Sequence, residues 1–146
     1  MLNPHILKQL TETKGIVTMT ALMSQLDDRL IPLAEQFLAQ CKAAGLDCRI
    51  TVTWRGEAAQ NAAKAANLSR AKFGDSPHNC HDQDGQPCSR AFDFAIFRDG
   101  EYVKNGSDSA YSKAGQIGEK LGLTYGGRWH TPDFDHLQLP NWRNLT

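Results

Sequence analysis

The chain has 146 residues, of which 16 are Lys or Arg and 16 are Asp or Glu, so its formal net charge is zero. This length fits one domain with a hydrophobic core. The balanced charge argues against a nucleic-acid-binding protein driven by phosphate neutralisation. No run approaches the roughly 18 apolar residues of a membrane-spanning helix, so membrane insertion is not expected either.

The N-terminal residues predict a helical extension, residues 1–30, that packs on the rest of a single domain, residues 1–146. Pro4 stands at the first position of a short helix, with Asn3 as its cap, and Gly15 ends it. A second short helix continues to Leu26. This extension carries no catalytic pattern, so packing is its expected role.

A stronger helix is predicted from about Pro32 to Ala44, where apolar residues recur at three- and four-residue steps. Cys48–Trp54 is rich in β-branched residues, which predicts a strand that delivers Arg55 at its end. Arg55 is a candidate site residue because residues after strand ends commonly line sites, although it could equally be a solvated charge. An alanine-rich helix, Glu57–Ser69, follows with Gln60 in its first turn.

The middle of the chain alternates between loop and strand. Phe73–Asn79 is a loop punctuated by Gly and Pro, and it places His78 on a stiff backbone just after Pro77. Ser89–Phe97 alternates like a strand, with Asp93 between two alanines. A buried carboxylate needs a cation, and a metal ion or a basic side chain would serve equally well.

Four cysteines, Cys41, Cys48, Cys80 and Cys88, allow two disulfides in three pairings. In a reducing cytoplasm they would be thiols. Cys80 and Cys88 bracket a polar, turn-forming segment that they could clip together. A structural zinc site made of Cys80, His81 and Cys88 is a further alternative, although the spacing matches no standard knuckle.

Beyond the Ser89–Phe97 strand, Asp99-Gly100 predicts a hairpin turn that leads to a second strand at Tyr102-Val103. A helix is predicted from Ser109 to Leu121. Gly122 ends it because glycine readily adopts the conformation found after helix C-termini.

The last third of the chain contains an acid three residues before a histidine, Asp133 and His136. After a turn fixed by proline, Leu137 and Leu139 alternate with His136 and Gln138, as in a strand with one apolar face. The histidine can then face a cleft that the acid also reaches. Alone, this pattern could equally be a polar surface strand.

Taken in order, these pieces resemble the zinc peptidases of the D-Ala-D-Ala carboxypeptidase and L-alanyl-D-glutamate endopeptidase family. The motifs that carry the resemblance are Thr53-Trp54-Arg55 followed by Gln60, Ser76-Pro77-His78, Ala91-Phe92-Asp93, Gly126-Gly127-Arg128-Trp129, and Asp133 to His136. The resemblance covers roughly residues 33–139, and the ordered set is more specific than any single motif.

The resemblance implies an α+β fold of the hedgehog/DD-peptidase type, a small antiparallel sheet with flanking helices and zinc in the central cleft. It implies three zinc ligands: His78, Asp93 and His136. Asp133 would be the catalytic base, and Arg55 would stabilise the developing oxyanion or hold a substrate carboxylate. Ser76 and Gln60 would take part in substrate binding, while Trp129 is expected to be a packing residue.

The sequence departs from the family pattern between the first two ligands. The Cys80–Cys88 segment makes the interval longer than the family's usual spacing, and this leaves His81 as an alternative to His78. Asp135 is similarly an alternative to Asp133 as the acid of the last motif. The family register favours His78 and Asp133.

The Gly-Gly-x-Trp segment, the single domain and an N-terminus without signal-peptide features look like a phage endolysin. The resemblance then implies a monomer that waits in the host cytoplasm, acts on bacterial peptidoglycan after release, and lyses the host cell. Its bond would be L-Ala–D-Glu of the stem peptide. The alternatives are a D-Ala-D-Ala carboxypeptidase and a non-catalytic zinc-fold protein that binds the wall.

Overall fold

The computed structural model describes residues 22–145. Its helices are α2 (Ile31–Ala43), α3 (Glu57–Ala65) and α4 (Ser109–Lys120), and its strands are β1 (Asp47–Val52), β2 (Ala91–Arg98), β3 (Glu101–Tyr102), β4 (Thr124–Tyr125) and β5 (His136–Gln138). Single 3-10 turns are η2 (Met23–Gln25), η3 (Pro77–Asn79), η4 (Gly126–Arg128) and η5 (Trp142–Asn144).

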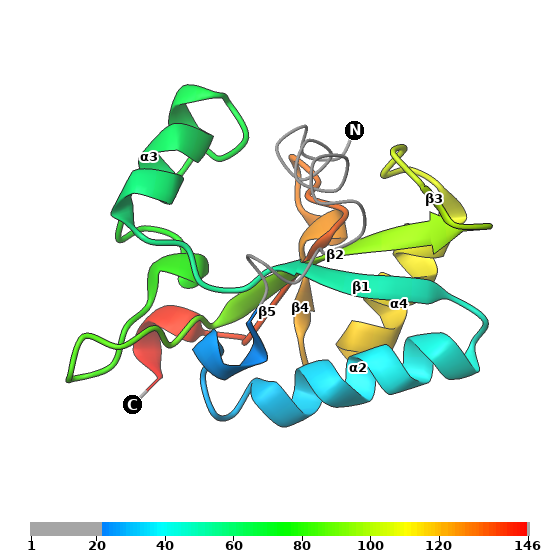
Figure 1. Cartoon of the computed structure of the whole chain (residues 1–146), viewed down its shortest axis with the longest axis horizontal. Coiled ribbons are helices and arrows are strands. Elements are labelled where there is room, and N and C mark those ends of the chain that lie inside the picture. The colour runs from blue at the N-terminus through cyan, green and yellow to red at the C-terminus, as the bar shows by residue number, and fades with distance from the viewer. Residues whose placement is uncertain (1–21, 146) are drawn as a thin grey trace.

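The described strands form one antiparallel sheet in the order β1-β2-β5-β4, with β3 paired to the end of β2. Helices α2 and α4 lie together below the sheet in Figure 1, whereas α3 projects above it. The predicted α+β fold with a small antiparallel sheet and flanking helices is therefore confirmed. The central strand β2 is buried along most of its length, so its polar residues face protein rather than bulk water.

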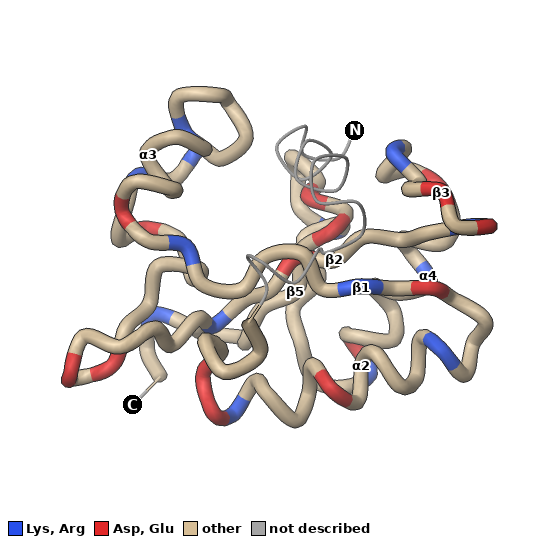
Figure 2. The backbone as a smooth tube through the Cα atoms, viewed as in Figure 1, with Lys and Arg blue, Asp and Glu red and all other residues tan. Residues whose placement is uncertain are grey.

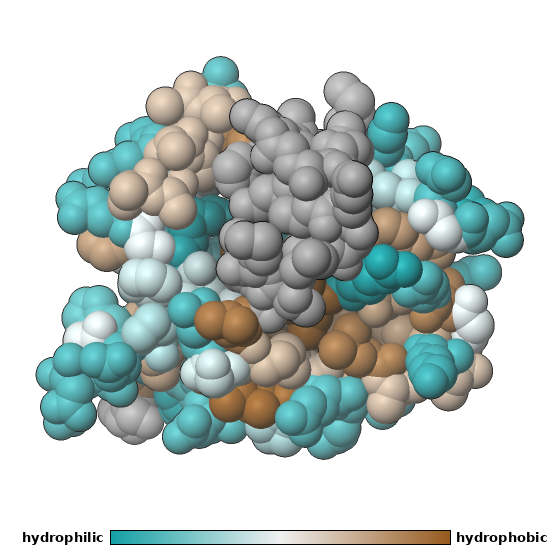
Figure 3. Space-filling view, viewed as in Figure 1, coloured by the Kyte–Doolittle hydropathy of each residue, from teal (hydrophilic) through white to brown (hydrophobic). Residues whose placement is uncertain are grey.

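The core lies between the sheet and the two helices beneath it. Phe92 and Phe94 of β2 project towards α2, where Phe37 contacts both rings at centroid distances of 5.4 and 5.2 Å. Tyr111 of α4 stacks on Phe94 at 5.8 Å. Hydrophobic residues accordingly gather at the junction of α2 and the sheet, while most of the outer surface shown is hydrophilic (Figure 3).

The hairpin between β2 and β3 forms at the predicted turn. Asp99 and Gly100 both have positive φ, 54° and 80°, as a two-residue hairpin turn of type I′ requires. Aspartate and glycine tolerate this conformation better than most residues.

The helix predicted over Glu57–Ser69 ends earlier, at Ala65. Asn67 adopts φ 59°, and the N–H of Leu68 donates to the carbonyl of Ala63 at 2.8 Å. This left-handed residue with its i+5 hydrogen bond closes the helix as a glycine often does. Ser69 is thereby released to form a hydrogen bond with Gln60.

The prediction of a second N-terminal helix is wrong for the residues that the structure describes. Residues 23–25 form a single 3-10 turn instead. Backbone pairing explains the difference. The N–H of Asp27 donates to the carbonyl of Ser89 at 2.8 Å, and the N–H of Ser89 donates to that of Gln25 at 2.8 Å. The first predicted helix lies outside the described residues.

Basic and acidic residues are scattered over the helices and loops (Figure 2). Within residues 22–145, no helix has the length and apolar character needed to cross a bilayer.

Candidate metal centre

Two of the predicted ligands face each other across neighbouring strands. Asp93 of β2 is the register partner of His136 of β5. Facing residues of an antiparallel pair project to the same side of the sheet, so this register brings the carboxylate and the imidazole together. The His136 Nδ1 atom lies 3.0 Å from Asp93 Oδ1.

The third predicted ligand, His78, is held by the turn η3. Pro77 opens the turn, Ser76 Oγ accepts from the His78 N–H at 3.3 Å, and Asn79 Oδ1 accepts from the Ser76 N–H at 3.2 Å. This reciprocal cap fixes the backbone on both sides of the histidine. His78 Nε2 then lies 3.2 Å from Asp93 Oδ1.

Backbone and amide acceptors outside the cluster set the tautomers of both imidazoles. His78 Nδ1 is 2.7 Å from the carbonyl oxygen of Thr53, which can only accept, so the proton sits on Nδ1 and Nε2 is free to bind a metal. His136 Nε2 is 2.9 Å from Gln138 Oε1, so Nδ1 is its free nitrogen. Such outer partners commonly orient histidine ligands in metal sites.

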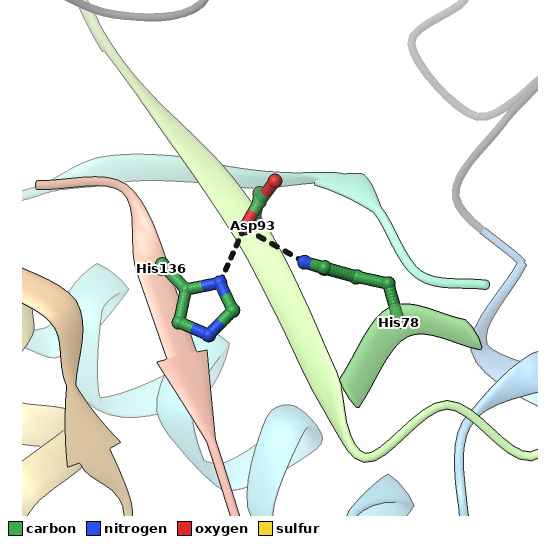
Figure 4. A group of neighbouring side chains, drawn as sticks. All are labelled: His78, Asp93 and His136. Atoms are coloured by element: carbon green, nitrogen blue, oxygen red, sulfur yellow. Dashed lines mark hydrogen bonds and ion pairs between the residues drawn. The ribbon is translucent and has the colours of Figure 1, made fainter. Parts of the chain in front are cut away.

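The spacing of these atoms fits a tetrahedral metal ion. The candidate ligand atoms of His78, Asp93 and His136 lie within 4.8 Å of one another, and all three residues are at most 5% exposed. A tetrahedral ion with bonds near 2.1 Å needs ligand atoms about 3.4 Å apart, close to the observed 3.0 and 3.2 Å. Figure 4 shows the Asp93 carboxylate between the two rings. Two nitrogens and one carboxylate oxygen leave a fourth position for water or substrate.

The charged groups of the cluster shift one another's pKa values. Burial alone would raise the pKa of Asp93, yet the two neighbouring imidazoles hold it well below its usual value. Burial lowers the pKa of His78. Burial also acts to lower the pKa of His136, but hydrogen bonding and attraction to Asp93 outweigh it and raise that pKa. At neutral pH the cluster therefore offers an ionised carboxylate, as a metal requires.

Arg55 lies beside the cluster, with Nη2 3.8 Å from Asp93 Oδ2 and its side chain 12% exposed. Its Nη1 donates to Gln60 Oε1 at 3.1 Å, and Asn79 Nδ2 donates to the same oxygen at 3.1 Å. Gln60 is fully buried and in turn donates to the carbonyl of Ala71 at 2.7 Å. Gln60 thus holds the Arg55 guanidinium in place from the protein interior. Any effect of Gln60 on substrate binding is therefore indirect and depends on Arg55.

Asp133 and Asp135 occupy different surroundings. The Asp133 side chain is 49% exposed, and its Oδ2 lies 3.9 Å from His136 Nδ1. Asp135 is buried, and its Oδ2 has no hydrogen-bond partner among the described residues. Burial, followed by the charges of Asp93 and Asp133, raises the pKa of Asp135 well above its usual value. The more exposed Asp133 is therefore better suited to exchange protons with a substrate.

A cleft of about 750 Å³ opens over the cluster. Its lining includes the predicted residues Arg55, Ser76, His78, Asp93, Asp133 and His136. Trp129, expected to be a packing residue, is 39% exposed, lines this cleft and lies 5.2 Å from the His136 ring. A cleft of this size accommodates a short peptide segment.

The alternative ligands are not brought together. Among the described residues, the groups that could hold a metal are His78/Asp93/His136 and Asp93/Asp133/Asp135, and neither contains a cysteine. His81 is exposed and contacts the carbonyl of Asp82. The alternative zinc site at Cys80, His81 and Cys88 is therefore wrong, and all four cysteines are free thiols.

Sequence reasoning missed several supporting groups of the site. The Thr53 carbonyl accepts a hydrogen bond from His78, and Asn79 donates one to the carbonyl of Arg55. No sequence motif predicts these two contacts. Asp135, the alternative acid of the last motif, is buried, and the sequence pattern gives no sign of this burial. A hint for Asn79 was available, because Ser76 and Asn79 have the spacing of a capping pair.

The protein thus has an α+β fold with a candidate mononuclear metal centre at the base of an open cleft. The centre consists of two buried imidazoles and one buried carboxylate. No protein-family model matches this chain, and no curated protein does. Among solved structures, the L-Ala D-Glu endopeptidase ChiX of Serratia marcescens is similar, with a TM-score of 0.63 over 80% of this chain and 82% of that chain. At 17% sequence identity, this likeness shows a common fold.

Proposed function

We propose that this protein is a zinc-dependent peptidoglycan peptidase that hydrolyses the L-Ala–D-Glu bond of the stem peptide. The observation that carries the proposal is the convergence of His78, Asp93 and His136, with Asp133 3.9 Å from His136 at the cleft. The fold shared with an L-Ala D-Glu endopeptidase supports the choice of bond.

In this proposal the ion would be held by His78, Asp93 and His136, through the nitrogens and the carboxylate oxygen that face one another. Zinc bound there would supply Lewis acidity and bring the pKa of a water ligand towards neutrality. Asp133 accepts a proton from the attacking water and later passes it to the leaving amine. Its partial exposure lets it reach both groups, whereas Asp93 is committed to the two imidazoles.

The remaining site residues act on the substrate carbonyl and on geometry. Arg55, held by Gln60, presents a fixed positive charge that stabilises the oxyanion or holds a substrate carboxylate. Ser76 lines the cleft and caps the turn of His78, so it can orient both the ligand and the substrate.

The biological setting that we propose is a phage endolysin. Such an enzyme would be held in the host cytoplasm, act as a monomer on bacterial peptidoglycan after release, and cause cytolysis. The open cleft supports a polymeric substrate, because a stem peptide can enter while its glycan stays outside.

The proposal is tested with Asp133→Asn and a matched variant, Asp75→Asn, which changes another exposed aspartate of the same cleft. Asp133→Asn should retain bound zinc and the folded circular-dichroism spectrum but lose at least about 100-fold in the rate of lysis of purified cell walls. Asp75→Asn should remain close to wild type. Unchanged lysis by Asp133→Asn would show that the base is misassigned.

Mass analysis of the digested muropeptides identifies the bond. New N-terminal D-Glu is expected for the endopeptidase, while released D-Ala would instead establish the carboxypeptidase. Wall binding without any new terminus, by zinc-loaded wild-type protein, would refute hydrolysis altogether.

A further inference from the structure

The segment between the first two candidate ligands forms a small hairpin that the proposed function does not use. The N–H of Cys88 donates to the carbonyl of Cys80 at 3.0 Å, and the N–H of Asp82 donates to that of Gln86 at 2.9 Å. His81 and Pro87 form the antiparallel bridge between these bonds. Cys80 and Cys88 are consequently a directly facing pair at the base of the hairpin.

Both thiols lie on the same side of this base. Facing residues of an antiparallel pair project to one side. Cys88 Sγ lies 3.5 Å from Asp27 Oδ2, and Cys80 is within electrostatic range of the same carboxylate and of Arg90. The Cα atoms of a hydrogen-bonded antiparallel pair are about 5.5 Å apart, inside the 4.4–6.8 Å range of disulfides.

We propose that Cys80 and Cys88 form a disulfide when the protein meets a small-molecule disulfide oxidant such as oxidised glutathione. One cysteine sulfur attacks the oxidant and releases one glutathione; the other then attacks the mixed disulfide and releases the second. The two cysteines lose one hydrogen each and are oxidised, and both protons end on the two glutathione thiols that are formed.

The bond would tie together the two chain segments that carry candidate ligands. His78 lies two residues before Cys80, and Asp93 lies five residues after Cys88. The N–H of Arg90 already donates to the carbonyl of Pro77 at 3.0 Å, so the two segments are adjacent in the fold. Closing the hairpin covalently removes conformational freedom from the unfolded chain between the ligands, which stabilises the folded protein.

The test treats the reduced full-length protein with oxidised glutathione under native conditions. Wild type should lose about 2 Da, the mass of the two thiol hydrogens that exchange removes. Digestion should yield a peptide linked through Cys80 and Cys88. The melting temperature should rise by about 5 °C or more on oxidation and return after reduction. Cys88→Ser should show neither change, whereas Cys48→Ser, the matched control at another half-buried cysteine, should show both.

Full alkylation of Cys80 and Cys88 after oxidation would overturn the proposal, as would a stable glutathione adduct on either residue. A link confined to Cys41 and Cys48 would also overturn it. A Cys80–Cys88 link without any rise in melting temperature would refute the stabilising role. None of these measurements uses hydrolysis, so their failure is distinguishable from failure of the proposed peptidase activity.

Discussion

Replacing Gln138 with leucine tests whether the metal centre depends on the tautomer of His136. In the wild type, Gln138 Oε1 lies 2.9 Å from His136 Nε2 and fixes the proton there, which leaves Nδ1 facing Asp93. Leucine has a similar size but no acceptor. The buried imidazole then loses the partner that holds both its proton and its ring orientation.

The expected effect follows from the cost of that hydrogen bond. Leaving a buried donor unpaired costs about 1–3 kcal/mol, and loss of an outer partner typically weakens metal binding by about 10- to 100-fold. Because His136 is 4% exposed and loses its outer acceptor, we expect the zinc Kd of Gln138→Leu to rise at least about 10-fold. Gln138→Glu keeps an acceptor and adds charge, so it should bind zinc at least as tightly as wild type.

The assay is competition for zinc between the metal-free protein and a chelating indicator. Gln40→Leu, the same substitution at an exposed position of α2, is the matched control and should bind like wild type. A Kd for Gln138→Leu indistinguishable from that of Gln40→Leu would refute the role of the amide. Equal losses in Gln138→Leu and Gln138→Glu would point to a packing effect instead.

Three further predictions concern stability. Arg29 lowers the pKa of Asp27, so the ionised pair stabilises the fold above the unfolded pKa of aspartate, near 4. Asp27→Asn should therefore cost about 2 kcal/mol of folding free energy at pH 7. The difference in melting temperature between wild type and this variant should shrink as the pH falls below 4. Gly115→Ala should lower the free energy of unfolding, measured by urea titration, by about 1–3 kcal/mol. The Cβ atom of the new alanine would lie 2.3 Å from the ring of the buried Tyr125. Unchanged stability would contradict this packing. Chelation of zinc should lower the melting temperature by about 10 °C, while the far-ultraviolet circular-dichroism spectrum stays that of a folded protein. Loss of the folded spectrum on chelation would contradict a preformed centre.

The strands and the candidate ligands have sequence signals that are local or ordered along the chain. Asp93 sits in an alternating apolar run, and that run became the central strand β2. Asp99-Gly100 specifies its turn by chemistry alone, since both residues must adopt positive φ. The Asp133–His136 pair follows from spacing, although the sequence could not show that β5 would lie beside β2.

The supporting contacts could not be predicted because they depend on backbone groups and long-range packing. The backbone carbonyl of Thr53 accepts a hydrogen bond from His78, which is 25 positions away in the sequence. Every residue has such a carbonyl, so the amino-acid sequence does not show which one will take this part. The shortened α3 depends on Asn67 taking a left-handed conformation, which glycine usually signals. Alternation along a strand likewise cannot tell that Asp135 is buried, because the chain bends just before β5.

Hydrogen bonds within the protein set the geometry of the candidate centre. His136 is fixed to Asp93 by strand register and to Gln138 by its outer nitrogen, while His78 is fixed by a capped turn and a backbone carbonyl. Both histidines therefore have their orientation determined by a hydrogen-bonded neighbour outside the candidate ligand set. Under the proposed function, such a preorganised site would lose little conformational entropy on binding a metal, and the half-exposed acid Asp133 would carry the proton.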